Sequence, residues 1–452
     1  MAGFNFFPQK GKNLKPHRIY KNLNQSIRLV IDNKEQYVKN PKADFTRTRK
    51  LSLEDTIKQI LSMEGGSLNR ELYHFAKAHK ISITSSAFIQ QRSKIRATAF
   101  ESILKDFNSR CNDKQKFKGY RLLAADGSAI NQFRDPNLES FISYPGQEYG
   151  YNQTHLNALY DLLNKTYFDI LMQPKPKQNE PQALIDMINR NSFSGKNIII
   201  ADRGYEGYNL IAHLVNKENV DFLIRARHGN GAMTAIRNLP MIELDIDVSF
   251  EITTAQTNED KLHKRILVQI QKENKHYGSK TIKRNWDFPS PYAMKFRVVR
   301  FMLDTGEYET IVTSLPRNRF SISEIKELYH MRWGIETSFR ELKYAIGLIN
   351  LHCKKEEFVE QEIYAAIIMY NYCSRIAACA SKEQNGNRLY KYQVNFTIAI
   401  HLCKEHYKQR SKDFKQLVLD ISCNTEPIRP GRHDKRNVKH KGFVGFTYRI
   451  AA

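Results

Sequence analysis

The order of short apolar runs between residues 120 and 227 constrains the fold more than any other feature of the chain. Five runs have the length and bounding turn residues of β-strands, and two segments between them have helical spacing. The strand-like runs are YRLLAAD (120–126), THLNALYDLL (154–163), TYFDILMQP (166–174), NIIIADRGY (197–205) and DFLIRAR (221–227). The helical segments are NEPQALIDMINRN, before the fourth run, and EGYNLIAHLVNKE, before the fifth. This order predicts an α/β fold with a mixed sheet flanked by helices.

The charge balance points to an anionic partner. The chain has 71 Lys and Arg against 47 Asp and Glu, a net charge of +24 and a pI of about 9.6. This excess favours nucleic acid as the partner over a merely basic protein without one. A helix that starts at Ser85 or Ser86 would add a polar face, either to read DNA or simply to be solvated. That face would consist of Gln90, Gln91, Arg92 and Lys94.

Changes of pattern along the 452 residues predict several regions. Ser52 opens a helix through the capping box SLED, and SISE at Ser321 opens another. FEITTA, RILVQIQ, FRVVRFML and YETIVTSL are strand-like, and YQVNFTIAIHLCKEH (392–406) is helical. The predicted regions are a basic, mostly helical DNA-binding region (1–115), the first part of a sheet core (116–228), a β-strand-rich insertion (229–318), the last core helix (319–350), and a C-terminal helical region with a basic tail (351–452).

Cysteine spacing and hydropathy indicate the compartment. The six cysteines form no CxxC pair and no zinc-type spacing, which is typical of reduced cysteines in a cytosolic protein. The start, MAGFNFFPQKGKNLKPHR, lacks the apolar stretch of a signal peptide, and no run approaches a membrane span. We therefore expect a cytoplasmic protein with no membrane partner. GNGAM lacks the lysine of a phosphate-binding loop, so we expect no nucleotide cofactor.

Three carboxylates lie at the ends or edges of predicted elements. Asp126 ends the first strand, Asp202 ends the fourth, and Glu336 lies on the helix after the insertion. Gathered without a cation, they would repel one another and raise each other's pKa values. Two divalent ions, Mg²⁺ or Mn²⁺, would remove that cost and clamp the attacking and leaving oxygens of a phosphoryl transfer. Taken singly, each Asp could be a turn residue and Glu336 the partner of a helical ion pair.

The stretch YHMRWGIETSFRELK (329–343) has an ordered polar stripe beside its apolar face. At about 100° per residue, the members of this stripe fall within an arc of roughly 80°. They are Tyr329, Arg332, Glu336, Arg340 and Lys343. The cations and the phenol are suited to hold the phosphates of a DNA strand while Glu336 reaches the metal ions. A glycosidase, which also uses paired carboxylates, does not fit this charge pattern.

Four residues of this stretch resemble a known family. Tyr329, Arg332, Glu336 and Lys343, separated by two, three and six residues, match the YREK signature of bacterial DDE transposases of the insertion sequence four type. ADGS and ADRGY look like the two Asp motifs of that family, and HLNALYD resembles its second core strand. The resemblance covers residues 80 to 345 approximately. It implies a ribonuclease-H-like catalytic core that the β-rich insertion interrupts.

The resemblance also implies a function. It implies a cut-and-paste transposase that binds the terminal inverted repeats of its element as a homodimer, and cleaves and joins double-stranded DNA through a hairpin intermediate. Asp126, Asp202 and Glu336 would hold two Mg²⁺ or Mn²⁺ ions, and the protein would work at the nucleoid in a bacterial cytoplasm. The DNA contacts that we predict are Tyr329, Arg332, Trp333, Arg340, Lys343 and Arg203.

Some roles remain open at this stage. Trp333 either stacks on a base flipped out of the duplex or is buried against the sheet, and Trp286 is a weaker candidate for stacking. Tyr205 either supports the site or contacts DNA. His155 either lines the site or is a satisfied core histidine. Two alternative functions are a transposase-derived DNA-binding protein without catalysis and a structure-specific nuclease with the same core.

Overall fold

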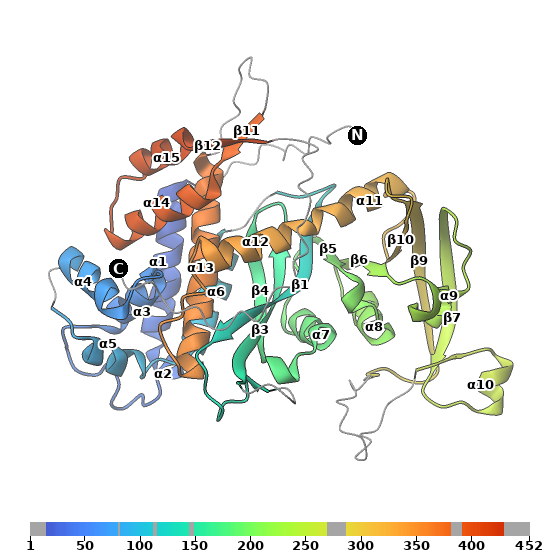
Figure 1. The fold of residues 1–452 in the computed structure, drawn as a ribbon, viewed down its shortest axis with the longest axis horizontal. Coiled ribbons are helices and arrows are strands. Elements are labelled where there is room, and N and C mark those ends of the chain that lie inside the picture. Colours follow the sequence, from blue (N-terminus) through green and yellow to red (C-terminus); the bar gives the residue numbers. More distant parts are fainter. Residues whose placement is uncertain are drawn as a thin grey trace.

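One large sheet runs through the middle of the molecule (Figure 1). The computed structural model describes residues 15–79, 82–111, 115–143, 149–268, 286–380 and 391–428. The sheet has ten strands in the order β2-β3-β1-β5-β6-β10-β9-β7-β8, with β4 also paired to β3. The strands are β1 (Tyr120–Gln132), β2 (Phe141–Ile142), β3 (Tyr151–Asp161), β4 (Thr166–Pro174), β5 (Lys196–Ala201), β6 (Val220–Ala226), β7 (Leu244–Thr253), β8 (Ile266–Leu267), β9 (Tyr292–Met302) and β10 (Tyr308–Thr313).

The part of the sheet formed by β4-β3-β1-β5-β6 corresponds to the five predicted strands. β3 is antiparallel to β1, β4 is antiparallel to β3, and β5 and β6 run parallel to β1. The predicted turn between β3 and β4 is present, with Lys165 at a positive φ of 52°. This arrangement confirms the predicted ribonuclease-H-like mixed sheet with flanking helices.

The prediction that the first strand ends at Asp126 was wrong. β1 continues to Gln132, so Asp126 lies in the middle of the strand. The parallel pairing with β5 ends at Ala125 and Ala201, but the antiparallel pairing with β3 continues from Asp126 opposite Ala158. Hydrogen bonds on that one side keep β1 extended after β5 has left it.

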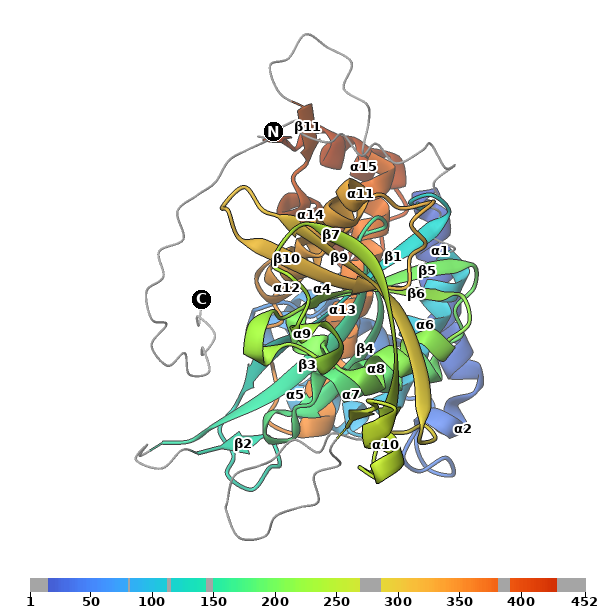
Figure 2. The same cartoon turned by 90° about the vertical axis from the view of Figure 1, so that its right-hand side faces the viewer.

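Residues after β6 extend the same sheet. β10 is antiparallel to β6, and β9 and β7 follow it outward. Figure 2 views the molecule from this end, with β7, β9 and β10 toward the viewer. The expected strand RILVQIQ is present as Ile266–Leu267, and its residues from 269 onward lie outside the described part of the chain.

Helices cover both faces of the core sheet. α7 (Glu180–Arg190) and α8 (Tyr208–Asn216) pack on one face, against Leu123 and Ala125 of β1. On the other face, α12 (Trp333–Tyr344) and α13 (Glu356–Ala380) pack against Ala124 and Ala158. Alternate residues of β1 therefore face different layers, as the pleat requires.

The N-terminal helices share a core with α13. They are α1 (Pro16–Asp32), α2 (Lys34–Tyr37), α3 (Leu53–Ser62), α4 (Leu68–His79), α5 (Ser85–Arg92) and α6 (Thr98–Cys111). Buried residues such as Ile27, Ile57 and Phe107 belong to the same apolar cluster as Ile367. The capping boxes are confirmed in part: Ser52 accepts from the amide of Asp55, and Ser321 and Glu324 form a complete box.

The polar face predicted for α5 is partly wrong. Arg92 is only 2% exposed, and its Nη1 lies 2.8 Å from the Glu362 carboxylate of α13. It also donates hydrogen bonds to Gln361 and to the Phe358 carbonyl. Arg92 therefore holds α5 against α13, and its side chain is not available to DNA on an open face.

The C-terminal region combines helices with a small second sheet. The helix predicted from Tyr392 begins only at Phe396, because Asn395 caps it there. The residues before it form Lys391–Val394 (β11), which pairs with Thr425–Ile428 (β12). The helices there are α14 (Phe396–Lys408) and α15 (Phe414–Cys423). The predicted basic tail lies beyond residue 428, outside the described part of the chain. All six cysteines are free, and no described helix is long and apolar enough to cross a membrane.

The buried Arg92–Glu362 ion pair predicts that removal of Arg92 strongly destabilises the protein. The pKa of Glu362 is lowered to about 2, because burial, which alone would raise it, is outweighed by the charges of Arg92 and His352. Arg92→Ala would leave a buried carboxylate unpaired and lower the free energy of unfolding by about 3–5 kcal/mol near pH 7. Because a depressed pKa stabilises above the unfolded value, the pair's contribution should fall away as pH drops from about 4.5 toward 2.

Chemical denaturation at several pH values measures this difference. The matched control is Lys39→Ala, which breaks an exposed ion pair with Glu357 on α13 and should cost at most about 1 kcal/mol. Equal losses in the two variants would show that the buried pair has no special role.

Candidate active site

The end of the β1–β5 pairing brings two carboxylates side by side. Ala125 and Ala201 form the last parallel pair, and Asp126 and Asp202 are the next residues on these neighbouring strands. Local hydrogen bonds fix both side chains: Asp126 accepts from the Gly127 amide at 2.8 Å, and Asp202 from the Gly204 amide at 2.7 Å.

The helix pair after the insertion supplies the third carboxylate. The last core helix, predicted as one element, is two, α11 (Ile322–Met331) and α12, which meet at Arg332 and lie over the sheet as one nearly continuous rod (Figure 1). Nη1 of Arg332 lies 3.6 Å from Asp126, and Nη2 lies 3.0 Å from Glu336. Arg332 thus bridges a carboxylate on the sheet and one on the helix.

Buried tyrosines hold α12 in this position. Tyr167 of β4 and Ser338 of α12 are joined by a hydroxyl hydrogen bond of 2.9 Å. Tyr370 of α13 donates to Glu341 of α12 at 2.7 Å, and its hydroxyl is also 3.1 Å from that of Tyr160. These bonds connect α12 to both the sheet and α13, on the helix face opposite Glu336.

The electrostatics of Asp126 reflect its burial first and its acidic neighbours second. Its pKa is raised to about 7 by burial and, to a smaller extent, by the charges of Asp202 and Glu336, against the opposing effects of the Gly127 amide and Arg332. Near neutral pH this carboxyl is therefore poised between its two protonation states.

The donor set suits a hard divalent cation, although the side chains are not gathered into a metal cage. Among the described residues, no three His, Cys, Asp or Glu side chains lie close enough to hold a metal ion. Asp126 and Asp202 are neighbours and Glu336 is 39% exposed, with Arg332 between the helix and the sheet. A cation at this point would take over the neutralising contacts that Arg332 makes.

The predicted DNA contacts divide into buried and exposed groups. Tyr329 and Arg332 are buried, at 4% and 5% exposure, and the guanidinium lies 5.7 Å from the tyrosine ring centroid. Trp333 is 41% exposed, which is inconsistent with burial against the sheet. Arg340 and Arg203 are exposed, and Lys343 is partly exposed. Trp286 packs against Phe288 and Tyr292 in the insertion, away from the carboxylates.

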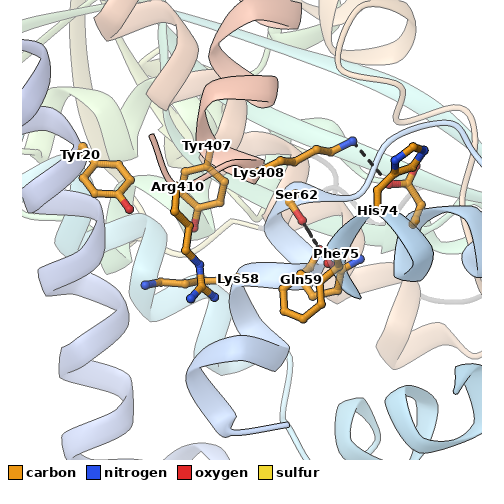
Figure 3. Close-up of a pocket in the computed structure, with 10 residues that line it drawn as sticks. Tyr20, Lys58, Gln59, Ser62, His74, Phe75, Tyr407, Lys408 and Arg410 are labelled. Atoms are coloured by element: carbon orange, nitrogen blue, oxygen red, sulfur yellow. Dashed lines mark hydrogen bonds and ion pairs between the residues drawn. The ribbon is translucent and has the colours of Figure 1, made fainter. Parts of the chain in front are cut away.

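A pocket elsewhere in the molecule is less suited to phosphate. It lies among α1, α3, α4 and the end of α14 (Figure 3). Its cations already have carboxylate partners: Lys58 pairs with Glu54 at 2.6 Å, Lys408 with Glu64 at 2.7 Å, and Arg410 with Asp55 at 2.7 Å. We therefore place the candidate active site at the carboxylates.

Comparison with known proteins agrees with this geometry. Residues 117–372, more than half of the chain, match the family described as the transposase DDE domain. The chain belongs to the DDE transposase family. This result confirms the resemblance to insertion-sequence DDE transposases, and the YREK signature itself stays a prediction.

Individual relatives of this DDE domain match over short stretches. The transposase for insertion sequence element IS421 of Escherichia coli is 32% identical over 75 residues, 16% of this chain and 20% of that protein. Transposase InsG for insertion sequence element IS4 of Escherichia coli strain K12 is 40% identical over 55 residues, 12% of each chain. The matches thus span a fifth or less of these relatives.

A solved structure is similar over a longer stretch but at a low level. The piggyBac transposase synaptic complex with hairpin DNA has a TM-score of 0.38 and 10% identity, over 93% of this chain and 84% of that chain. The fold assignment of the DDE domain therefore rests on the strand order of its own sheet.

Sequence patterns did not single out one further acidic residue of this DDE domain. Glu180 begins α7, and its Oε1 lies 2.8 Å from Nε2 of His155 on β3. This contact lowers the pKa of Glu180. The pKa of Tyr205 is raised by burial and then by the charges of Glu180, Asp126 and Asp202. The buried phenol thus lies near all three carboxylates. An acidic residue in the first turn of a helix is common, which explains why it gave no signal.

The raised pKa of Asp126 predicts a gain in stability on its neutralisation. Without divalent ions, Asp126→Asn should unfold with a free energy about 1–3 kcal/mol higher than the natural protein above pH 7. Because the folded pKa lies above the unfolded value, the difference should be absent below about pH 4 and grow up to about pH 7. Denaturation at pH 4, 6 and 8 measures this difference, and substitution of the exposed Asp186 of α7 by Asn is the control. A difference that shrinks as pH rises would contradict the assignment.

The close packing at Gly127 predicts that substitutions of Gly127 and His155 have coupled effects on stability. A Cβ at Gly127 would lie 2.1 Å from Nε2 of His155 and 2.7 Å from Oε1 of Glu180. Gly127→Ala should therefore lower the free energy of unfolding by about 1–3 kcal/mol. Most of this loss should disappear in a His155→Ala background, which a double-mutant cycle measures. Gly231→Ala, where the nearest atom is 3.6 Å away, is the matched control; additive effects would exclude the contact.

Proposed function

We propose that this DDE protein is an active cut-and-paste transposase that cleaves and transfers DNA strands at Asp126, Asp202 and Glu336. The observation that supports the proposal most directly is the position of Asp126 and Asp202, the next residues after the last β1–β5 pair. Glu336 reaches the same place through the shared contact with Arg332. A structural ion pair would need only one of these carboxylates.

The family implies dependence on a divalent metal in general, and we propose two Mg²⁺ or Mn²⁺ ions held by the three carboxylates. When bound, such ions stabilise the charge on the attacking and leaving oxygens of a phosphodiester. The first reaction would be hydrolysis of one strand, which frees a 3′-hydroxyl. That hydroxyl would then attack the opposite strand, which closes a hairpin on the end of the element and releases the flanking DNA. A second hydrolysis would reopen the hairpin and free the 3′-hydroxyl again, and this hydroxyl would attack the target DNA.

The protein's own residues would contribute charge and position. Arg332, held under Asp126 and Glu336, is a cation placed where phosphate oxygens would approach. Arg340, Lys343 and Arg203 would bind the backbone, and Trp333 would stack on a base. Tyr329 would act by supporting Arg332, since its own ring is buried.

We further propose the biological setting. The net charge of +24 fits binding of double-stranded DNA, both the inverted-repeat ends and the target. Two copies of the chain would pair two ends of the element at the nucleoid of a bacterial cytoplasm. Neither a membrane nor a nucleotide cofactor enters the proposed reaction.

A cleavage assay tests the proposal. The substrate is a labelled duplex that contains the inverted repeat at one end of the element and the adjoining flanking DNA. It is incubated with Mg²⁺, with Ca²⁺ or with EDTA. We expect Mg²⁺-dependent nicking at the boundary, followed by a hairpin or joined product. Glu336→Gln should reduce the rate at least about 1,000-fold, because it removes a charge that the transition state needs.

A matched variant and two contrary outcomes make the assay decisive. Glu327→Gln, one turn or more before Arg332 on α11, should cleave at the natural rate. Binding without cleavage in any metal would instead support a DNA-binding protein derived from a transposase. Cleavage without joining would support a structure-specific nuclease.

A further inference from the structure

The exposed face of α12 carries more than the predicted DNA contacts. At about 100° per residue, Trp333, Arg340 and Tyr344 fall within an arc of roughly 40°. The residues that α12 buries lie on the opposite side. They are Ile335, Ser338, Phe339 and Leu342. Tyr344 is 69% exposed, more than Trp333 at 41%.

Tyr344 differs from the tyrosines that hold the helix in place. Tyr160, Tyr167 and Tyr370 are buried and hydrogen-bonded around α12. Tyr344, the last residue of the helix, presents most of its surface to solvent. A single exposed aromatic side chain is common on protein surfaces, but Tyr344 shares one face of α12 with the exposed residues Trp333 and Arg340, so the three form one patch.

The neighbouring charges indicate what would cover this surface. Arg340 lies one turn before Tyr344 on the same face, and Lys343 and Glu336 lie along its edge. A protein partner with an apolar face would not require these cations. A DNA strand provides phosphates for the cations and flat bases for the rings.

We propose that Tyr344 is a second stacking platform for an unpaired DNA base, on the same strand as the base at Trp333. Eleven residues of helix give a rise of about 16 Å between the two positions, which corresponds to about five nucleotides of a strand whose bases are spaced about 3.4 Å apart. α12 would then contact two bases of one strand at a fixed separation, and Glu336 lies between the two contacts along the helix. This inference rests on the proposed function, because it places the strand on the helix that carries Glu336.

A fluorescence assay tests the inference. The probe is a duplex with a single-stranded tail of about ten nucleotides, with 2-aminopurine at one tail position at a time, in Ca²⁺. We expect two quenched positions about five nucleotides apart. Tyr344→Ala should abolish quenching at one position only and weaken binding about tenfold, while Trp333→Ala should abolish the other.

Control variants separate stacking from structure. Tyr344→Phe keeps the ring and should retain the quenching. Tyr149→Ala removes a ring shortly before β3 that is 68% exposed, and it should change nothing. Thermal unfolding of each variant confirms that the fold is intact.

The outcomes distinguish this inference from the proposed function. If the natural protein cleaves DNA but Tyr344→Ala quenches both positions as before, the second platform is excluded and the transposase stands. If the natural protein neither binds the probe nor cleaves any duplex, the proposed function fails, and the inference fails with it.

Discussion

The burial of an acidic group beside other carboxylates is the constraint on which this site depends. Asp126 and Asp202 are brought together by backbone pairing, and Glu336 is added by a helix whose position is fixed by other contacts. The pKa of Asp126, raised by burial and by its acidic neighbours, reports the cost of this arrangement. Arg332 offsets part of the cost within the protein alone. The electrostatics of the site therefore favour any partner that brings positive charge.

The two faces of α12 have different tasks: one anchors the helix and the other carries the charged side chains. On its inner face, α12 is tied down through Ser338 and Glu341 to buried tyrosines. On its outer face it presents the carboxylate, the cations and the exposed rings. A rigid helix that is anchored on one face can hold the side chains of its other face in place without rearrangement. Groups that are already positioned for reaction lower the activation barrier.

Much of the core was predictable from sequence, because each strand of the β4-β3-β1-β5-β6 sheet is a distinct apolar run with clear turn signals. The order of these runs also indicated that Asp126 and Asp202 lie on strands of one sheet, and the β1–β5 pairing makes those strands neighbours. The misses have a common physical cause, which is contact with residues far along the chain. Asp126, followed by Gly and Ser, reads as the end of a strand, yet pairing with β3 continues β1 to Gln132. Arg92 reads as a surface cation, yet Glu362, 270 residues later, buries it. Glu180 reads as an ordinary helix start, and only the position of His155 marks it as part of the site.

The core shared by the N-terminal helices and α13 has a genetic consequence. α13 covers α1, α3 and α6, and it is encoded after all three carboxylates. A nonsense mutation before residue 356 would yield a fragment in which these helices lose their apolar cover. Such a fragment would aggregate or be degraded rather than persist as a competitor for DNA ends. A truncated gene copy would therefore yield no stably folded product.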